Sequence, residues 1–384
     1  MIRPALGSFV LPVLLLSAVL SAAPAIADDP AADAVRLYDE GRYAEARPLL
    51  EQLHAEGAAD GPLLYRLYYC QLNARDPQAR DTLTAAVARL ESDLPGATDL
   101  EVPFYLANAY INQGRRADAR RVAGEAVARI DSGSIADPTT PIEMFRLGKL
   151  YADVDRDDGA ERWYRAALDG FAAQGDAAPR PYVEWAAAWL AERAQAAGDD
   201  AATVDLYSTL LEGGKGTMDD WDRLAVAQAR TGDLAGAERS WRQAEKANPA
   251  EANRARYCYR LAAMARELGG LPTALDDGRT IAELSKDDLQ QVLGDQVRAL
   301  GELRDEVAGM KKVKKRQRRK LEARLDAIHR TFTAAALEFA LKRYGIREAA
   351  FFGGYAPLIF RPREWRLPEP GSATRQPADP PAGD

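Results

Sequence analysis

The chain has 384 residues, of which 47% are hydrophobic and 28% charged, with 2 Cys and 2 His. This balance is typical of a folded protein, because disordered chains are poorer in apolar residues. The length exceeds one ordinary core of roughly 100–200 residues, so we expect several domains or a repeat array. Two cysteines exclude a disulfide scaffold, and a formal charge of −7 is opposite in sign to that of a general nucleic-acid binder.

The first 27 residues predict a secretory signal peptide. Arg3 precedes an apolar stretch at residues 9–20, which is followed by Pro24 and by an A-x-A pattern that ends at Ala27. A positive flank, a short apolar run and a small-residue cleavage site define such signals. The alternative is a transmembrane anchor, which needs about 20 apolar residues. We expect cleavage after Ala27 and a periplasmic or secreted protein.

Helical repetition organises residues 28–284. In the clearest unit, residues 221–249, small or apolar residues recur at helical spacing on both sides of a turn at residues 231–233. The glycine of this turn suits the left-handed backbone that ends a helix, and its aspartate suits the start of the next one. Pro249 ends the second helix, because proline lacks the amide hydrogen that a helix interior needs. The unit is therefore predicted to be a helical hairpin.

The same pattern recurs along the chain, with a weaker copy from Gly269 to Ile281. Where two helices touch closely, each copy places a small residue; these are Ala46, Ala79, Ala119, Ala160, Ala237 and Ala274. The pattern resembles the tetratricopeptide repeat, a hairpin of about 34 residues. The resemblance implies an all-α solenoid of six to seven repeats. The alternative is an ordinary irregular helical domain.

The resemblance also implies that a protein or peptide binds in a concave groove lined by the first helix of each hairpin. The groove-facing family positions are filled here by Tyr68, Gln71, Asn108, Asn112, Lys149, Glu192 and Asp222. Some family members use an asparagine at the position of Asn108 to clamp a peptide backbone or a terminal carboxylate. The lysine expected four residues earlier is Phe104 here. The alternative is that these polar positions are merely solvated.

Residues 285–345 predict a long amphipathic, coiled-coil-like helix or a helical hairpin, because apolar residues recur there every three or four positions. Gly309 predicts a bend or turn, since glycine weakens a helix interior by about 1 kcal/mol relative to alanine. Gly345 predicts the end of the helix.

A basic cluster lies within this segment, at residues 311–320. Its members are Lys311, Lys312, Lys314, Lys315, Arg316, Arg318, Arg319 and Lys320. Three interpretations remain open. The first is a solvated helical face, either with or without salt bridges to an acidic repeat surface. The second is contact with anionic lipid or an acidic envelope polymer. The third, nucleic-acid binding, is disfavoured because no aromatic residues are interleaved for base stacking.

The C-terminal part is predicted to cover the end of the array. Residues 346–367 are apolar and are expected to be extended, with residues 361–365 held so by proline. Docking of this segment into a partner is the alternative. Residues 368–384 are expected to be disordered. Cys70 and Cys258 are expected to be buried free thiols.

No motif in the sequence supplies catalytic chemistry. His54 and His329 lack neighbouring ligands with zinc-site spacing, and neither a phosphate-binding loop nor a nucleophile elbow occurs. We therefore expect a protein that has no enzymatic activity and binds neither a cofactor nor a metal. The sequence predicts a non-enzymatic scaffold of the bacterial cell envelope that binds a protein or peptide in its groove. The alternative is a surface-associating factor that binds anionic lipid or acidic polymer through residues 311–320.

Overall fold

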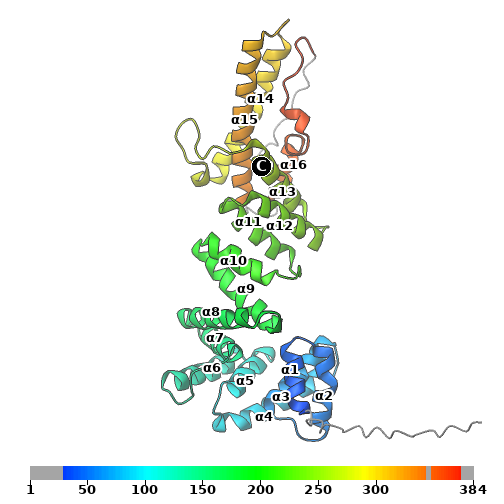
Figure 1. Ribbon diagram of the computed structural model, residues 1–384, viewed down its shortest axis with the longest axis vertical. Helices are drawn as coiled ribbons and strands as arrows, with labels where there is room; N and C mark the ends of the chain where they lie inside the picture. Colours follow the sequence, from blue (N-terminus) through cyan, green and yellow to red (C-terminus); the bar gives the residue numbers. More distant parts are fainter. Residues whose placement is uncertain (1–28, 343–346, 373–384) are drawn as a thin grey trace, which may run out of the picture. The chain divides into compact units, whose positions relative to one another are not determined.

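The computed structural model describes residues 29–342 and 347–372, and within these residues the chain is α-helical with short 3-10 segments and no strand (Figure 1). The predicted all-α class is confirmed. The chain divides into two compact units, Met1–Gly96 and Ala97–Asp384, which we describe in turn. The predicted signal peptide, residues 1–27, lies outside the described residues. No helix in the described part of the chain has the length and apolar character needed to cross a membrane.

The first unit consists of two helical hairpins. Its helices are α1 (Pro30–Asp39), α2 (Tyr43–Ala55), α3 (Gly61–Asn73) and α4 (Ala79–Asp93). Each helix packs against the next. Ala46, Leu50 and Cys70 are buried between them. The side chain of Asp60 caps α3 by accepting a hydrogen bond of 2.9 Å from the backbone N of Leu63.

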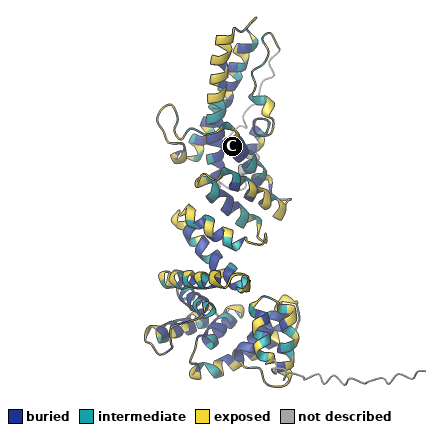
Figure 2. Cartoon of the chain, viewed as in Figure 1, coloured by how far each residue is buried: buried dark blue, intermediate teal, exposed yellow. Residues whose placement is uncertain are grey.

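The second unit begins with four more hairpins. Their helices are α5 (Glu101–Asn112), α6 (Arg116–Asp131), α7 (Pro141–Asp153), α8 (Asp157–Gln174), α9 (Arg180–Ala197), α10 (Asp200–Leu210), α11 (Met218–Arg230) and α12 (Leu234–Ala247). Consecutive helices pack against each other within and between these hairpins. In Figure 2 the buried residues lie along the facing sides of the paired helices. The succession of hairpins confirms the predicted tetratricopeptide-like architecture.

Small residues set the distance between paired helices. A Cβ atom on Gly159 of α8 would lie 2.2 Å from Cδ1 of Tyr151, and one on Gly148 of α7 would lie 2.9 Å from Cδ1 of Tyr164. Real Cβ atoms do not approach other atoms so closely, so each glycine makes room for a tyrosine of the opposite helix. Five of the predicted contact alanines are buried, namely Ala46, Ala79, Ala119, Ala160 and Ala237.

The prediction of a weak seventh copy from Gly269 to Ile281 is wrong. After α13 (Asn253–Leu268) the backbone of Gly269 and Gly270 has φ of 65° and 119°, which ends the helix. Ala274 is exposed and forms an isolated antiparallel bridge with Thr280 instead of packing in a hairpin. Helix α13 packs instead against α12 and against helices from the end of the chain.

Residues 286–341 form a helical hairpin, so the second of the two predicted alternatives is confirmed. Its helices are α14 (Lys286–Ala308) and α15 (Lys315–Leu341), and the break at Gly309 lies where the sequence predicts a bend. The seam between them is apolar and includes Leu293, Leu300, Leu303, Val307, Leu321 and Leu325. Gly345 lies outside the described residues.

The prediction of an extended segment at residues 346–367 is wrong, because residues 347–360 form helix α16 (Arg347–Phe360). Phe352, Tyr355 and Ile359 recur at helical spacing and are buried, so the helix covers apolar surface of this unit as expected of a cap. Residues 361–365, also predicted to be extended, form the 3-10 helix η4 (Pro362–Trp365).

The last described residues run along the α14–α15 hairpin. The backbone N of Gly371 donates a hydrogen bond of 2.9 Å to the carbonyl of Ala308, so residues 368–372, predicted to be disordered, have a defined contact. Residues 373–384 lie outside the described part of the chain. Both cysteines are buried and free, as predicted.

Trp365 anchors this C-terminal segment. Its ring stacks on His329 of α15, with ring centroids 3.9 Å apart and ring planes inclined by 14°. Its Nε1 donates a hydrogen bond of 2.8 Å to the carbonyl of Leu358. His329 Nε2 is buried and has no hydrogen-bond partner among the described residues. Burial lowers the pKa of His329 to about 4, because the imidazolium would lose its hydration.

This burial predicts a stability loss in mild acid. His329 has an ordinary pKa of 6.5 when unfolded and about 4 when folded, so the unfolded chain takes up the proton more readily. The free energy of unfolding therefore falls as the pH drops from 6.5 to about 4. Proton NMR on a His54→Gln variant, which retains only His329, should show an imidazole midpoint near 4. A midpoint near 6.5 would show that the ring is not buried against Trp365.

Candidate functional site

An aromatic ladder crosses the first helices of three consecutive hairpins. The rings of Phe104 (α5) and Phe145 (α7) lie 6.3 Å apart, and those of Phe145 and Trp185 (α9) lie 6.1 Å apart, all edge to face. Phe104 and Phe145 are buried, whereas Trp185 is 48% exposed. The ladder therefore ends in an indole ring that is open to solvent.

Helical spacing places further side chains on the same side of these helices. Asn108, Ile111 and Asn112 follow Phe104 by one to two turns, as Lys149 and Asp153 follow Phe145 and Glu192 follows Trp185. We call this surface the α5–α7–α9 face. The structure thus brings together four of the residues predicted to line the groove. Asn112 and Glu192 are exposed, and Asn108 is half-buried.

A desolvated ion pair lies in the middle of the face. Lys149 Nζ forms a very short contact with Asp153 Oδ1 and lies 5.4 Å from the centre of the Trp185 ring. Burial raises the pKa of Asp153, an effect that the charge of Lys149 opposes. Asp153 Oδ2 is buried and has no hydrogen-bond partner among the described residues. The pair fixes the lysine beneath the indole, so this part of the face is ordered in the free protein.

Asn108 is partly engaged within its own helix. Its Nδ2 donates a hydrogen bond of 2.9 Å to the carbonyl of Phe104. One amide hydrogen is therefore already used, and the second hydrogen and the Oδ1 acceptor are the groups that a ligand could meet.

Asp222 faces the interior. Its Oδ1 accepts a hydrogen bond of 2.9 Å from Nε1 of the fully buried Trp241 and forms an ion pair with Arg254 of α13. The carboxylate therefore joins α11, α12 and α13 and is not open to a ligand in a groove.

Tyr68 and Gln71 belong to the first unit. Both are buried in α3, where Tyr68 packs edge to face on Tyr65 at 5.5 Å. Burial raises the pKa of the Tyr68 phenol. Gln71 Oε1 is buried with no hydrogen-bond partner among the described residues.

Sequence reasoning missed Trp185 and Ile111, the two large apolar side chains exposed on the face. The signal for Trp185 was present, because it stands seven residues before Glu192 and is followed by three alanines. Its large neighbours one turn away on α9, Tyr182 and Trp189, pack against Phe145 and Tyr164.

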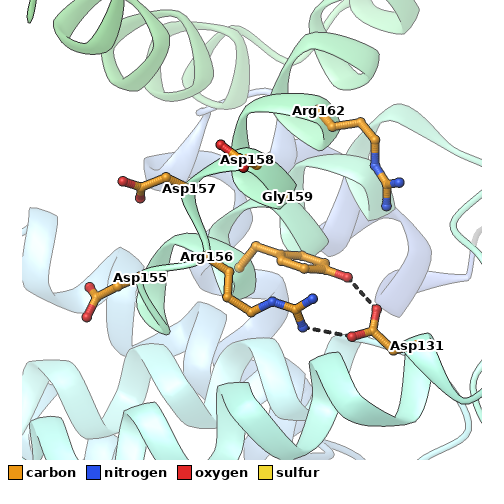
Figure 3. Close-up of a pocket in the computed structure, with 8 residues that line it drawn as sticks. Asp131, Asp155, Arg156, Asp157, Asp158, Gly159 and Arg162 are labelled. Carbon is orange, nitrogen blue, oxygen red and sulfur yellow. Dashed lines mark hydrogen bonds and ion pairs between the residues drawn. The ribbon is translucent and has the colours of Figure 1, made fainter.

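A surface pocket of about 710 Å³ lies on the second unit, at the ends of α6 and α7 and the start of α8 (Figure 3). It is lined by Asp131, Tyr151, Asp155, Arg156, Asp157, Asp158, Gly159 and Arg162. The Tyr151 hydroxyl donates a hydrogen bond of 2.6 Å to Asp131 Oδ1, and Arg156 donates one of 2.7 Å to Asp131 Oδ2. These two hydrogen bonds lower the pKa of Asp131.

The acids of this pocket do not converge. In Figure 3 the carboxylates of Asp155 and Asp157 point away from Asp131, whose two oxygens are already bonded. Within residues 29–342 and 347–372, no group of three or more His, Cys, Asp or Glu side chains is arranged to hold a metal ion. The pocket therefore offers neither a paired-carboxylate site nor a metal site.

Comparison with known proteins gives only a distant likeness. No family model and no curated protein matches the chain. Among the solved structures that match is the C-terminal part of a TPR repeat-containing protein from Cytophaga hutchinsonii, with 12% sequence identity and a TM-score of 0.30. The match covers 83% of this chain and 98% of that chain. A superposition this loose carries no functional information.

Proposed function

We propose that the chain is a non-enzymatic scaffold that binds a protein or peptide segment on the α5–α7–α9 face. The observation that carries the proposal is the exposure of Trp185, 48% of whose surface is open to solvent at the end of a buried aromatic ladder. We also propose a location in the bacterial cell envelope, on the basis of the signal-like residues 1–27.

Exposed apolar surface gathers on this face. The large apolar side chains exposed among the described residues are Leu72, Ile111, Trp185 and Phe360. Two of these four, Ile111 and Trp185, lie on the α5–α7–α9 face. Tryptophan is enriched among the residues that contribute most binding energy in protein interfaces, because its large ring loses water contact at little cost in side-chain entropy.

The ring of Trp185 is also held in place. Phe145 lies against it at 6.1 Å, and Lys149 is fixed 5.4 Å from its centre by the ion pair with Asp153. A contact that is ordered in the free protein loses less conformational entropy on binding. Rigidity and exposure together distinguish Trp185 from a surface residue without a role.

The side chains around Trp185 define the chemistry of the partner. An apolar or aromatic side chain would cover the indole, a second apolar side chain would cover Ile111, and the amide of Asn108 would pair with the peptide backbone. Exposed Glu192, two turns after Trp185, favours a basic residue next to that apolar anchor. The proposed ligand is therefore a peptide segment with an apolar anchor beside a positive charge.

The proposal predicts that Trp185→Ala weakens peptide binding about thirtyfold, which corresponds to about 2 kcal/mol for a central interface residue. Peptides are selected from a random displayed library on the wild-type protein, and their dissociation constants are then measured by calorimetry. The selected sequences should share an apolar residue with a neighbouring Lys or Arg.

Phe360→Ala provides the matched control, because Phe360 is a 38% exposed aromatic residue of the same unit that lies on α16. This variant should bind the selected peptides like the wild type. Equal losses in the two variants, or selected peptides that are indifferent to Trp185→Ala, would contradict the proposal.

A further inference from the structure

The turn between α14 and α15 concentrates positive charge at the end of the hairpin. We call residues 309–320 the basic tip. All eight of its Lys and Arg side chains are exposed, and the segment contains no acidic residue. Figure 2 shows this end of the α14–α15 hairpin as mostly exposed.

Little of this charge is neutralised within the chain. Among the described residues, Arg318 is the one member of the eight with an ion pair, at 3.1 Å from Glu322. A second pair, between Arg324 and Glu306 at 2.6 Å, lies just beyond the tip. The interpretation of the cluster as salt-bridged to an acidic repeat surface therefore has no support in these contacts. Seven of the eight cations, all except Arg318, face water.

The start of α15 adds to the positive potential. Its N-cap residue Lys314 makes no capping hydrogen bond, and its first turn contains no acidic side chain. The N-terminal end of a helix carries a partial positive charge, so cations there are unfavourable by themselves. A bound anion would reduce the repulsion between these cations and would accept hydrogen bonds from the backbone N–H groups of the first turn.

The hairpin is packed on both sides of the basic tip. Next to it, Val307 and Leu321 are buried in the apolar seam between the two helices. On the other side, Gly371 bonds to the carbonyl of Ala308 at 2.9 Å. Arg304 forms an ion pair of 3.4 Å with Glu364 of η4. A packed hairpin therefore carries the five tip cations that belong to α15, whereas Lys311, Lys312 and Lys314 lie in the turn between its two helices.

The shape and the charge distribution favour a flat anionic surface. At 100° per residue, the basic residues of the first turns of α15 spread over about half of its circumference. The segment has no aromatic ring for stacking on bases. The remainder of the chain has a formal charge of −7 − 8 = −15, so an anionic surface would repel it.

We infer that the basic tip docks end-on onto the headgroup surface of a membrane that contains anionic phospholipid. The inference does not depend on the α5–α7–α9 face. A single Lys or Arg near such a surface contributes a several-fold increase in binding, and the tip presents several at once.

Vesicle sedimentation tests this inference. The wild-type protein should bind vesicles of phosphatidylcholine with about a third phosphatidylglycerol at low salt, and about 1 M salt should abolish that binding by shortening the screening length. Substitution of Lys311, Lys312, Lys314 and Lys315 by Gln should lower the partition coefficient roughly a hundredfold or more.

The matched control replaces four other exposed cations of the same unit by Gln, namely Arg116, Lys215, Arg239 and Lys246. It has the same net charge as the tip variant and should bind vesicles like the wild type, as should Trp185→Ala. Equal losses in the tip and control variants, or equal binding to pure phosphatidylcholine, would overturn the inference. Tip-dependent binding of duplex DNA that is tighter than vesicle binding would overturn it in favour of a nucleic-acid partner.

Discussion

The close approach of paired helices at glycine and alanine positions is the constraint on which the rest of the structure depends. In the α7–α8 hairpin the arrangement is reciprocal: Gly148 of α7 accommodates Tyr164 of α8, and Gly159 of α8 accommodates Tyr151 of α7. A missing side chain on one helix lets a large ring of the other approach its backbone closely. The two rings then fill the space that the helices enclose, which makes the packing specific to this pairing.

The α5–α7–α9 face depends on the same contact. Tyr164, which lies over Gly148, is fully buried and packs against Phe145 at 5.6 Å and Trp189 at 5.2 Å. Phe145 is the middle ring of the ladder that supports Trp185. The position of the exposed indole is thus determined by the packing inside the α7–α8 hairpin. The basic tip is supported independently, by the α14–α15 seam and the chain end that Trp365 anchors.

The hairpins could be predicted from local sequence patterns, because each hairpin is encoded within about 34 residues by a turn glycine and small contact residues. The same reading failed at Ala274, where a small residue follows two glycines but no second helix forms. It also failed at residues 347–360, which were predicted to be extended although Phe352, Tyr355 and Ile359 have helical spacing. For the site, family positions predicted Lys149 and Glu192, which lie on the proposed α5–α7–α9 face. They could not show that Asp222 bonds to Trp241 and Arg254, which depends on contacts between three helices.

A double-mutant cycle on Gly148→Ala and Tyr164→Leu tests the central constraint most directly, with the free energy of unfolding as the readout. The added Cβ clashes with the Tyr164 ring, so leucine at position 164 should relieve part of the cost of alanine at position 148. The account predicts that the double variant is less destabilised than the sum of the single variants by about 1–2 kcal/mol. Gly294→Ala, a glycine of α14 with open space around it, should instead stabilise the protein by about 0.5–1 kcal/mol. Additivity of the two substitutions within about 0.5 kcal/mol would contradict the account.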